Sequence, residues 1–195
     1  MNSMQPYLSA SPYIDCDSPA IVDLARQLAG RTNTEITLVR ACFEFVRDEI
    51  RHSADFKLNP VTCKASAVLQ HKTGYCYAKS HLLAALLRAN GIPAGLCYQR
   101  LSIGDSGAPY CLHGLNAVYL SEFGWQRLDA RGNKPGVNAQ FNPPAEALAF
   151  AIREPQERNL PEIWAEPLQV VVEVLERSSS YEQVLANLPD IALCA

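Results

Sequence analysis

Cys76 is the residue best placed to do chemistry, because it falls on the first turn of a predicted helix. The first N–H groups of a helix have no intrahelical acceptor and together carry about half a positive charge. This field favours the thiolate, which is the nucleophilic form of cysteine, and the same N–H groups can stabilise a developing oxyanion. The alternative is that Cys76 is only a small buried apolar residue, as most cysteines are.

The helix that carries Cys76 is predicted between Gly74 and Pro93. Thr73 and Gly74 supply a cap and a sharp entry, and Asn90-Gly91 supplies the stop, since glycine readily takes the left-handed conformation after the last turn. The apolar face consists of residues at helical spacing, namely Leu82, Leu83, Leu86 and Ala89. We therefore predict a helix that is buried against a core.

His113 and Asp129 can be brought together by a β-hairpin. Alternating runs cover residues 113–120 and 125–130, and the turn-forming segment 121–124 separates them. The midpoint between His113 and Asp129 is position 121, so the two residues are predicted to share a face, within a register error of one or two residues. A carboxylate beside an imidazole fixes its tautomer and stabilises the charged ring. Cysteine, histidine and aspartate on these elements form the layout for thiol nucleophilic catalysis.

Other residues near these positions are weaker candidates, and each has a plain structural alternative. Lys79, one turn along the helix, could assist the thiolate electrostatically, although a solvated lysine is the more ordinary outcome. His71 is interpreted as an exposed loop histidine. Residues that could line a pocket or simply pack are Tyr75, Tyr77, Tyr110 and Gln99. The turn-rich segment 102–112 directly precedes His113 and is our candidate for a lid or specificity loop.

The composition narrows the class of protein. The chain has 195 residues, of which 48% are hydrophobic and 19% charged, and its net charge of −3 argues against nucleic acid as the main partner. No apolar stretch approaches the length needed to cross a bilayer, and no secretory signal is recognised at the N-terminus. The seven cysteines form no Cys-x-x-Cys pair, so neither a zinc ribbon nor a disulfide framework is predicted. A reducing cytoplasm fits this pattern best.

The periodicity of the chain changes from helical to alternating after Pro93. Helices are predicted over residues 18–30, 32–50, 64–70, 76–90, 145–153 and 168–175, with a last helix starting near 180. Strands are predicted over residues 96–101, 113–120 and 125–130. We expect a single domain over 1–195, with a core at about 18–135 and a helical C-terminal extension at about 140–195.

The combined pattern resembles the transglutaminase-like superfamily, which shares its catalytic arrangement with papain-type proteases and arylamine acetyltransferases. The matching segments lie between residues 20 and 130, namely Phe45–Ile50, Gly74–Cys76, Leu86–Ala94, His113, Asn116–Leu120 and Gly124–Asp129. The resemblance implies an α+β, papain-like fold in which the N-terminal helices and the nucleophile helix pack on an antiparallel sheet. By this resemblance Cys76 would be the nucleophile, His113 the base and then the acid, and Asp129 the orienting carboxylate.

This resemblance also implies a reaction. The Cys76 thiolate would attack an amide carbonyl of a peptide, protein or small-molecule substrate, and water or an amine would then resolve the thioester. We expect the Cys76 N–H to be one oxyanion donor, and we expect no cofactor and no metal. The alternatives are a catalytically inactive binding or scaffold module and a Cys/His metal site, although Cys76 and His113 lack two further ligands at suitable spacing.

Two positions depart from the family pattern. Gly95 stands where an arginine usually follows Gly-Ile-Pro-Ala, and Leu115 stands where a tryptophan usually lies two residues after the histidine. Neither departure removes a catalytic group. Both imply that the surroundings of the pocket differ from those of the family.

Overall fold

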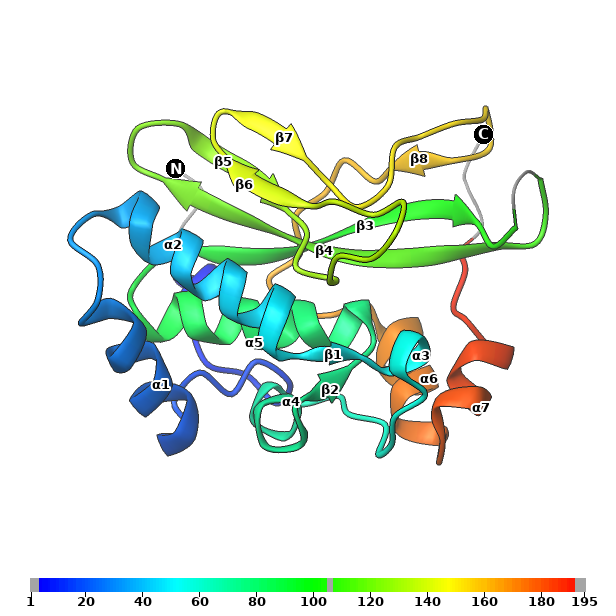
Figure 1. Ribbon diagram of the computed structural model, residues 1–195, viewed down its shortest axis with the longest axis horizontal. Helices are drawn as coiled ribbons and strands as arrows, with labels where there is room; N and C mark the ends of the chain where they lie inside the picture. The colour runs from blue at the N-terminus through cyan, green and yellow to red at the C-terminus, as the bar shows by residue number, and fades with distance from the viewer. Residues whose placement is uncertain (1–3, 105–106, 192–195) are drawn as a thin grey trace.

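An antiparallel sheet with helices packed on one face forms the centre of the computed structural model, which describes residues 4–104 and 107–191 (Figure 1). The sheet has the strand order β5-β4-β3-β8. Its strands are β3 (Ala94–Ser102), β4 (Tyr110–Leu120), β5 (Gly124–Leu128) and β8 (Arg158–Asn159). The predicted α+β fold, with a helix layer on an antiparallel sheet, is confirmed.

Helix α5 (Cys76–Ala89) lies along one face of the sheet and contacts β3 and β4. Every residue from Cys76 to Arg88 is buried, because further helices cover its remaining sides. These helices are α1 (Pro19–Ala29), α2 (Glu35–Glu44) and α4 (Ala65–His71). The predicted stop is confirmed, since Gly91 has a φ of +72°. The predicted start is displaced, because the N-cap is Tyr75, and Thr73–Gly74 form the short strand β2.

The helix expected from Thr32 begins later than predicted. Thr34 is its N-cap, and a reciprocal pair of hydrogen bonds joins the backbone and side chain of Thr34 to those of Thr37. Glu35 is the first helical residue. Three short elements continue the chain, namely the π-helical turn η2 (Phe45–Glu49), strand β1 (Arg51–His52), which pairs in parallel with β2, and helix α3 (Ser53–Phe56).

The helix predicted over residues 145–153 is wrong. A hairpin of β6 (Gln140–Asn142) and β7 (Ala145–Ala147) lies there instead, followed by irregular chain. Distant segments hold this region, since the Phe141 ring packs 6.1 Å from that of Phe43, and the Ala149 N–H donates to Asp129. Such tertiary contacts override the helical propensity of the local sequence, which is rich in alanine.

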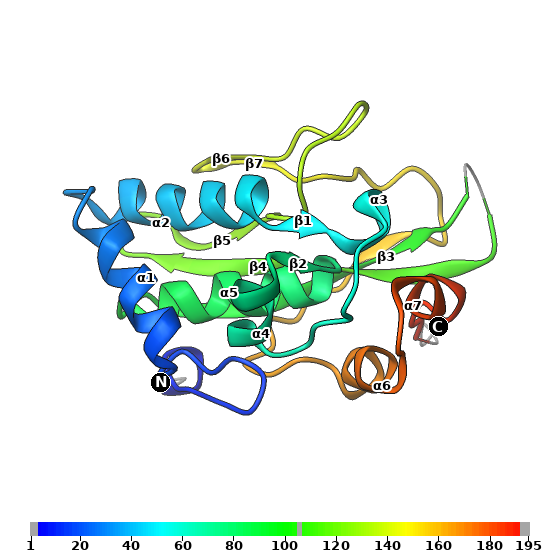
Figure 2. The same cartoon turned by 60° about the horizontal axis from the view of Figure 1, so that its bottom comes forward.

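The ends of the described chain pack against this core. Helices α6 (Gln169–Arg177) and α7 (Tyr181–Ala186) occur where helices are predicted. Figure 2 shows them side by side, below the end of the sheet where β3 finishes and β4 begins. Residues 4–17 are irregular apart from one 3₁₀ turn, η1 (Gln5–Tyr7). The segment after α7 therefore contacts the start of β4, where the Leu112 N–H donates to the Pro189 carbonyl.

Strand β4 approaches helix α5 most closely at Gly114. A Cβ atom added at Gly114 would lie 2.9 Å from Cδ1, 3.1 Å from Cα and 3.2 Å from N of Tyr77. The Tyr77 hydroxyl also donates to the Leu112 carbonyl, at 2.5 Å. Glycine therefore allows the first turn of α5 to rest directly on the strand that carries His113.

Replacing Gly114 by alanine is expected to destabilise the protein by about 1–3 kcal/mol, because the new methyl group must displace the backbone of Tyr77. Urea denaturation measures this loss. Gly30→Ala is the matched control, since its Cβ would have its nearest contact at 3.4 Å and the backbone φ is −64°. An equal effect of the two substitutions would contradict a close contact at Gly114.

Candidate active site

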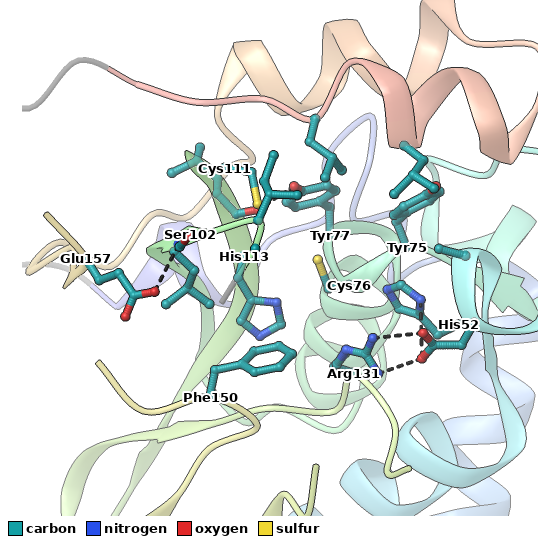
Figure 3. A pocket seen from close by; sticks show the side chains of 18 of the residues that line it. His52, Tyr75, Cys76, Tyr77, Ser102, Cys111, His113, Arg131, Phe150 and Glu157 are labelled. Atoms are coloured by element: carbon teal, nitrogen blue, oxygen red, sulfur yellow. Dashed lines mark hydrogen bonds and ion pairs between the residues drawn. The ribbon is translucent and has the colours of Figure 1, made fainter. Parts of the chain in front are cut away.

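Cys76, His113 and Asp129 meet where helix α5 begins against strand β4 (Figure 3). His113 Nε2 lies 2.7 Å from Asp129 Oδ2, so the second ring nitrogen, Nδ1, is not engaged by the carboxylate. The Gly114 N–H donates to Cys76 Sγ at 3.4 Å. The structure therefore brings together all three residues that the sequence predicts for the site.

The hairpin that unites His113 with Asp129 has a slightly different register from the one predicted. Asn116 pairs with Leu128, so the pairing is centred on residue 122 rather than 121. Asp129 consequently follows the last residue of β5, and its side chain reaches His113 from just beyond the strand. The difference falls within the expected error of one or two residues.

The Asp129 carboxylate is completely buried and accepts three hydrogen bonds. Its Oδ2 atom accepts from His113 and from the Ala149 N–H at 3.1 Å, and its Oδ1 atom accepts from the Arg131 N–H at 3.2 Å. Burial alone would raise the pKa of Asp129, but the charge of His113 and these hydrogen bonds hold it below its ordinary value. Asp129 therefore remains an anion that fixes the orientation of the imidazole.

His113 is 5% exposed, and the edge of its ring packs against Phe150, with 5.0 Å between ring centroids. Burial lowers the pKa of His113, but the charges of Asp129 and Cys76, with hydrogen bonds to both, outweigh it and raise the pKa to about 10. The protonated imidazole is thus favoured between the carboxylate and the sulfur. The imidazolium places a positive charge beside the Cys76 sulfur.

The first turn of α5 supplies backbone donors beside Cys76. The Lys79 N–H closes the turn on the Tyr75 carbonyl at 2.9 Å, so the N–H groups of Cys76, Tyr77 and Ala78 precede the first helical hydrogen bond. Cys76 is 7% exposed, which leaves its sulfur accessible from one side. A helix N-terminus favours negative charge both on the sulfur and on an oxyanion next to it.

Lys79 is neither solvated nor directed at the thiolate. It is only 1% exposed, and its Nζ donates to the carbonyl oxygens of Arg47, at 3.3 Å, and Ile50. Burial, and to a lesser extent the charge of Arg131, lower the pKa of Lys79 to about 7. The expectation of a solvated lysine is wrong, because this side chain binds carbonyl groups at the end of the preceding helical segment.

A cavity of about 430 Å³ opens beside Cys76 and His113. Tyr75 and Tyr77 line it, as proposed from the sequence. Gln99 and Tyr110 do not line this cavity. The Gln99 side chain donates to the Phe150 carbonyl at 3.2 Å and lines a separate hollow. The Tyr110 ring packs against the Arg100 guanidinium, 4.1 Å from the ring centroid. Residues 102–104 of the candidate lid line the cavity, and residues 105–106 lie outside the described residues.

Sequence reasoning missed a polar cluster on the other side of Cys76 from His113 (Figure 3). The Asp55 carboxylate pairs with the Arg131 guanidinium at 2.7 and 3.1 Å and with Lys134 Nζ at 2.7 Å. His52 Nδ1 lies 3.7 Å from Asp55, and burial and the charge of Arg131 lower the pKa of His52 to about 3. The helical pattern lapses near residue 52, so the sequence carried no signal for this cluster. His71 is exposed, as expected.

The described residues offer neither a metal-binding cluster nor a membrane-spanning helix. None of their His, Cys, Asp and Glu side chains gathers in a group of three or more that could hold a metal ion. None of the helices in residues 4–104 and 107–191 combines the length and the apolar character that a bilayer crossing needs.

Residues 22–130, more than half of the chain, match the family described as the transglutaminase-like superfamily. The chain belongs to this superfamily. Its nucleophile helix and its β4–β5 hairpin both lie within the matched residues. No match was found among curated proteins.

Solved structures share the fold of this superfamily member at low sequence identity. A candidate cysteine protease from Cytophaga hutchinsonii is 21% identical, with a TM-score of 0.54 over 67% of this chain and 43% of that one. The periplasmic domain of TgpA from Pseudomonas aeruginosa is also 21% identical, with a TM-score of 0.51 over 65% of this chain and 46% of that one. This chain therefore spans less than half the length of either structure.

Selective alkylation is expected at Cys76. Burial raises the pKa of Cys42, Cys63, Cys97 and Cys111 to about 12, so these four side chains remain thiols near neutral pH. Iodoacetamide at pH 6–7 should modify Cys76 first, and His113→Ala should slow that reaction about tenfold or more. Peptide mapping by mass spectrometry measures each rate. Unchanged modification of Cys76 in His113→Ala would contradict an activated pair.

The His113–Asp129 pair is expected to make stability depend on pH. The folded pKa of His113, about 10, lies above the unperturbed value of about 6.5. The stabilisation from its proton is therefore fully present below about pH 6.5 and is lost as the pH rises through about 10. In urea denaturation, the stability advantage of the wild type over His113→Gln should be larger at pH 6 than at pH 10.5. The exposed-site variant His71→Gln serves as the control, and a difference that does not change with pH would contradict the pairing.

Proposed function

We propose that this protein is a cysteine hydrolase or acyltransferase that acts on an amide bond. One observation carries the proposal, namely that Cys76 lies beside His113 at the cavity and that His113 is hydrogen-bonded to the buried Asp129 carboxylate. The Gly114 N–H on the sulfur and the membership of the transglutaminase-like superfamily support it. The similar structure from Cytophaga hutchinsonii, a candidate cysteine protease, is consistent with the same chemistry.

In the first half of the proposed reaction, the Cys76 thiolate attacks the carbonyl carbon of the amide. A C–S bond forms, and the carbonyl π electrons move to the oxygen, which the Cys76 N–H stabilises as an oxyanion. His113 then gives its proton to the amide nitrogen, and the C–N bond breaks when the carbonyl is restored. The amine leaves, and a thioester on Cys76 remains.

In the second half, water or an amine attacks the thioester. Neutral His113 takes a proton from the attacking group, the C–S bond breaks, and the thiolate and the imidazolium are both regenerated. Water gives a carboxylic acid and an amine gives a new amide. Asp129 acts through His113 in both halves, because its buried carboxylate stabilises the imidazolium without touching the substrate.

We propose a peptide, protein or small-molecule amide as the substrate and the cytoplasm as the compartment. The six described cysteines, at positions 16, 42, 63, 76, 97 and 111, are all free thiols, and free thiols persist in a reducing compartment. Cell fractionation with antibody detection tests this location. Recovery of the protein from an oxidising compartment would contradict it.

Acylation by p-nitrophenyl acetate tests the chemistry without a known substrate. We expect a burst of p-nitrophenol equal to the enzyme concentration and an acetyl group on Cys76 in acid-quenched samples. Cys76→Ala should abolish the burst, and His113→Ala should slow it by about 10²–10⁴-fold. Cys63→Ala is the matched control, since that thiol lies outside the cavity.

Either outcome of this experiment is informative. Full acylation in Cys76→Ala, or its absence from the wild type, would favour an inactive binding or scaffold module. If the acyl-enzyme forms, adding a primary amine and comparing amide with free acid among the products distinguishes transfer from hydrolysis.

A further inference from the structure

The cavity beside Cys76 has a polar part and an apolar part. The polar part holds the charged cluster of Asp55, Arg131 and Lys134 described above. The apolar part is formed by side chains from the β3–β4 end, the segment after β7 and the C-terminus, namely Leu101, Ile103, Leu112, Phe150, Leu185 and Leu188. Substrate pockets of this size are commonly apolar with a few polar groups that set orientation.

Two of these apolar side chains are far more exposed than their type normally is. Ile103 is 48% exposed and Leu185 is 50% exposed, and both border the cavity from different segments of the chain. Leaving apolar surface in water costs about 25 cal/mol per Å². Exposed apolar side chains gathered at the mouth of a cavity therefore indicate a surface that an apolar ligand covers.

The C-terminal wall of the apolar part is formed by Leu185 and Leu188. Hydrogen bonds of the residues that follow it hold this wall in place. The Leu112 N–H donates to the Pro189 carbonyl at 2.7 Å, and the Arg100 guanidinium binds both carboxylate oxygens of Asp190 at 2.7 Å. Figure 3 shows this part of the chain running above the cavity to helix α7. Because the wall is fixed in place and the cavity beside it remains open, the wall can contact a ligand without rearranging. It lies outside the residues that match the superfamily.

Two charged residues, Arg153 and Glu157, also line the cavity. The Glu157 carboxylate accepts hydrogen bonds from the backbone N–H groups of Ser102, at 3.0 Å, and Arg153, at 2.7 Å. Burial raises the pKa of Glu157, but its backbone hydrogen bonds and, to a smaller extent, the charge of Arg153 outweigh this effect and lower the pKa below its ordinary value.

We infer that the acyl donor carries a large apolar side chain, of the size of leucine or phenylalanine, which binds between Ile103 and the wall formed by Leu185 and Leu188. This inference rests on the proposed function in taking Cys76 as the nucleophile. It deepens that function by assigning the substrate class, namely amides with an apolar acyl part.

A series of N-alkylmaleimides tests the apolar pocket, because these neutral reagents differ only in chain length. We expect N-hexylmaleimide to modify Cys76 about tenfold or more faster than N-methylmaleimide, since the alkyl chain is buried before the thiol reacts. Leu188→Asp and Ile103→Asp should each remove this preference, so that the ratio of the N-hexylmaleimide rate to the N-methylmaleimide rate falls to about one. Ile152→Asp, at an exposed apolar residue outside this cavity, is the matched control and should keep the preference.

The outcomes separate the inference from the proposed function. Equal rates along the series at a Cys76 that still depends on His113 would overturn the apolar pocket and retain the nucleophile. A slow reaction at Cys76, indifferent to both His113 and chain length, would overturn the proposed function itself. If one aspartate variant does not fold, the other tests the opposite wall of the same pocket.

Discussion

The site depends on how closely the first turn of α5 can rest on strand β4. Gly114 makes this contact possible, because the backbone of Tyr77 occupies the space of a side chain there. His113 is the residue next to Gly114, and Cys76 is the residue next to Tyr77, so one backbone contact fixes the separation of His113 and Cys76. Rigid elements, rather than long flexible side chains, therefore set the geometry.

The sequence predicted the parts of the site that local patterns determine. The stop at Gly91 and the alternating strands around residues 121–124 located Cys76, His113 and Asp129. Lys79 and the polar cluster of His52, Asp55 and Arg131 could not be found in this way, because their burial results from packing between segments far apart in the chain. A lysine on a helix face looks solvated until carbonyl groups from another segment surround it.

The structure explains the two departures from the family pattern, Gly95 and Leu115, in different ways. A Cβ at Gly95 would overlap the Ile163 side chain and lie 3.1 Å from the Trp164 carbonyl, and Leu96 exchanges backbone hydrogen bonds with Trp164 at 2.7 and 2.9 Å. Gly95 therefore marks where a later segment crosses the sheet, a contact that no local pattern reveals. Leu115 is fully buried in a small apolar cluster on the sheet, away from the cavity.

The wall formed by Leu185 and Leu188 has a consequence for the order in which the protein matures. Residues 76–129 leave the ribosome well before residues 181–190, which are joined to the core through Arg100 and Leu112. A growing chain therefore holds Cys76, His113 and Asp129 before it has the wall formed by Leu185 and Leu188. The residues of the candidate site and one wall of its cavity are encoded in successive parts of the same chain, and synthesis of the later part completes the cavity.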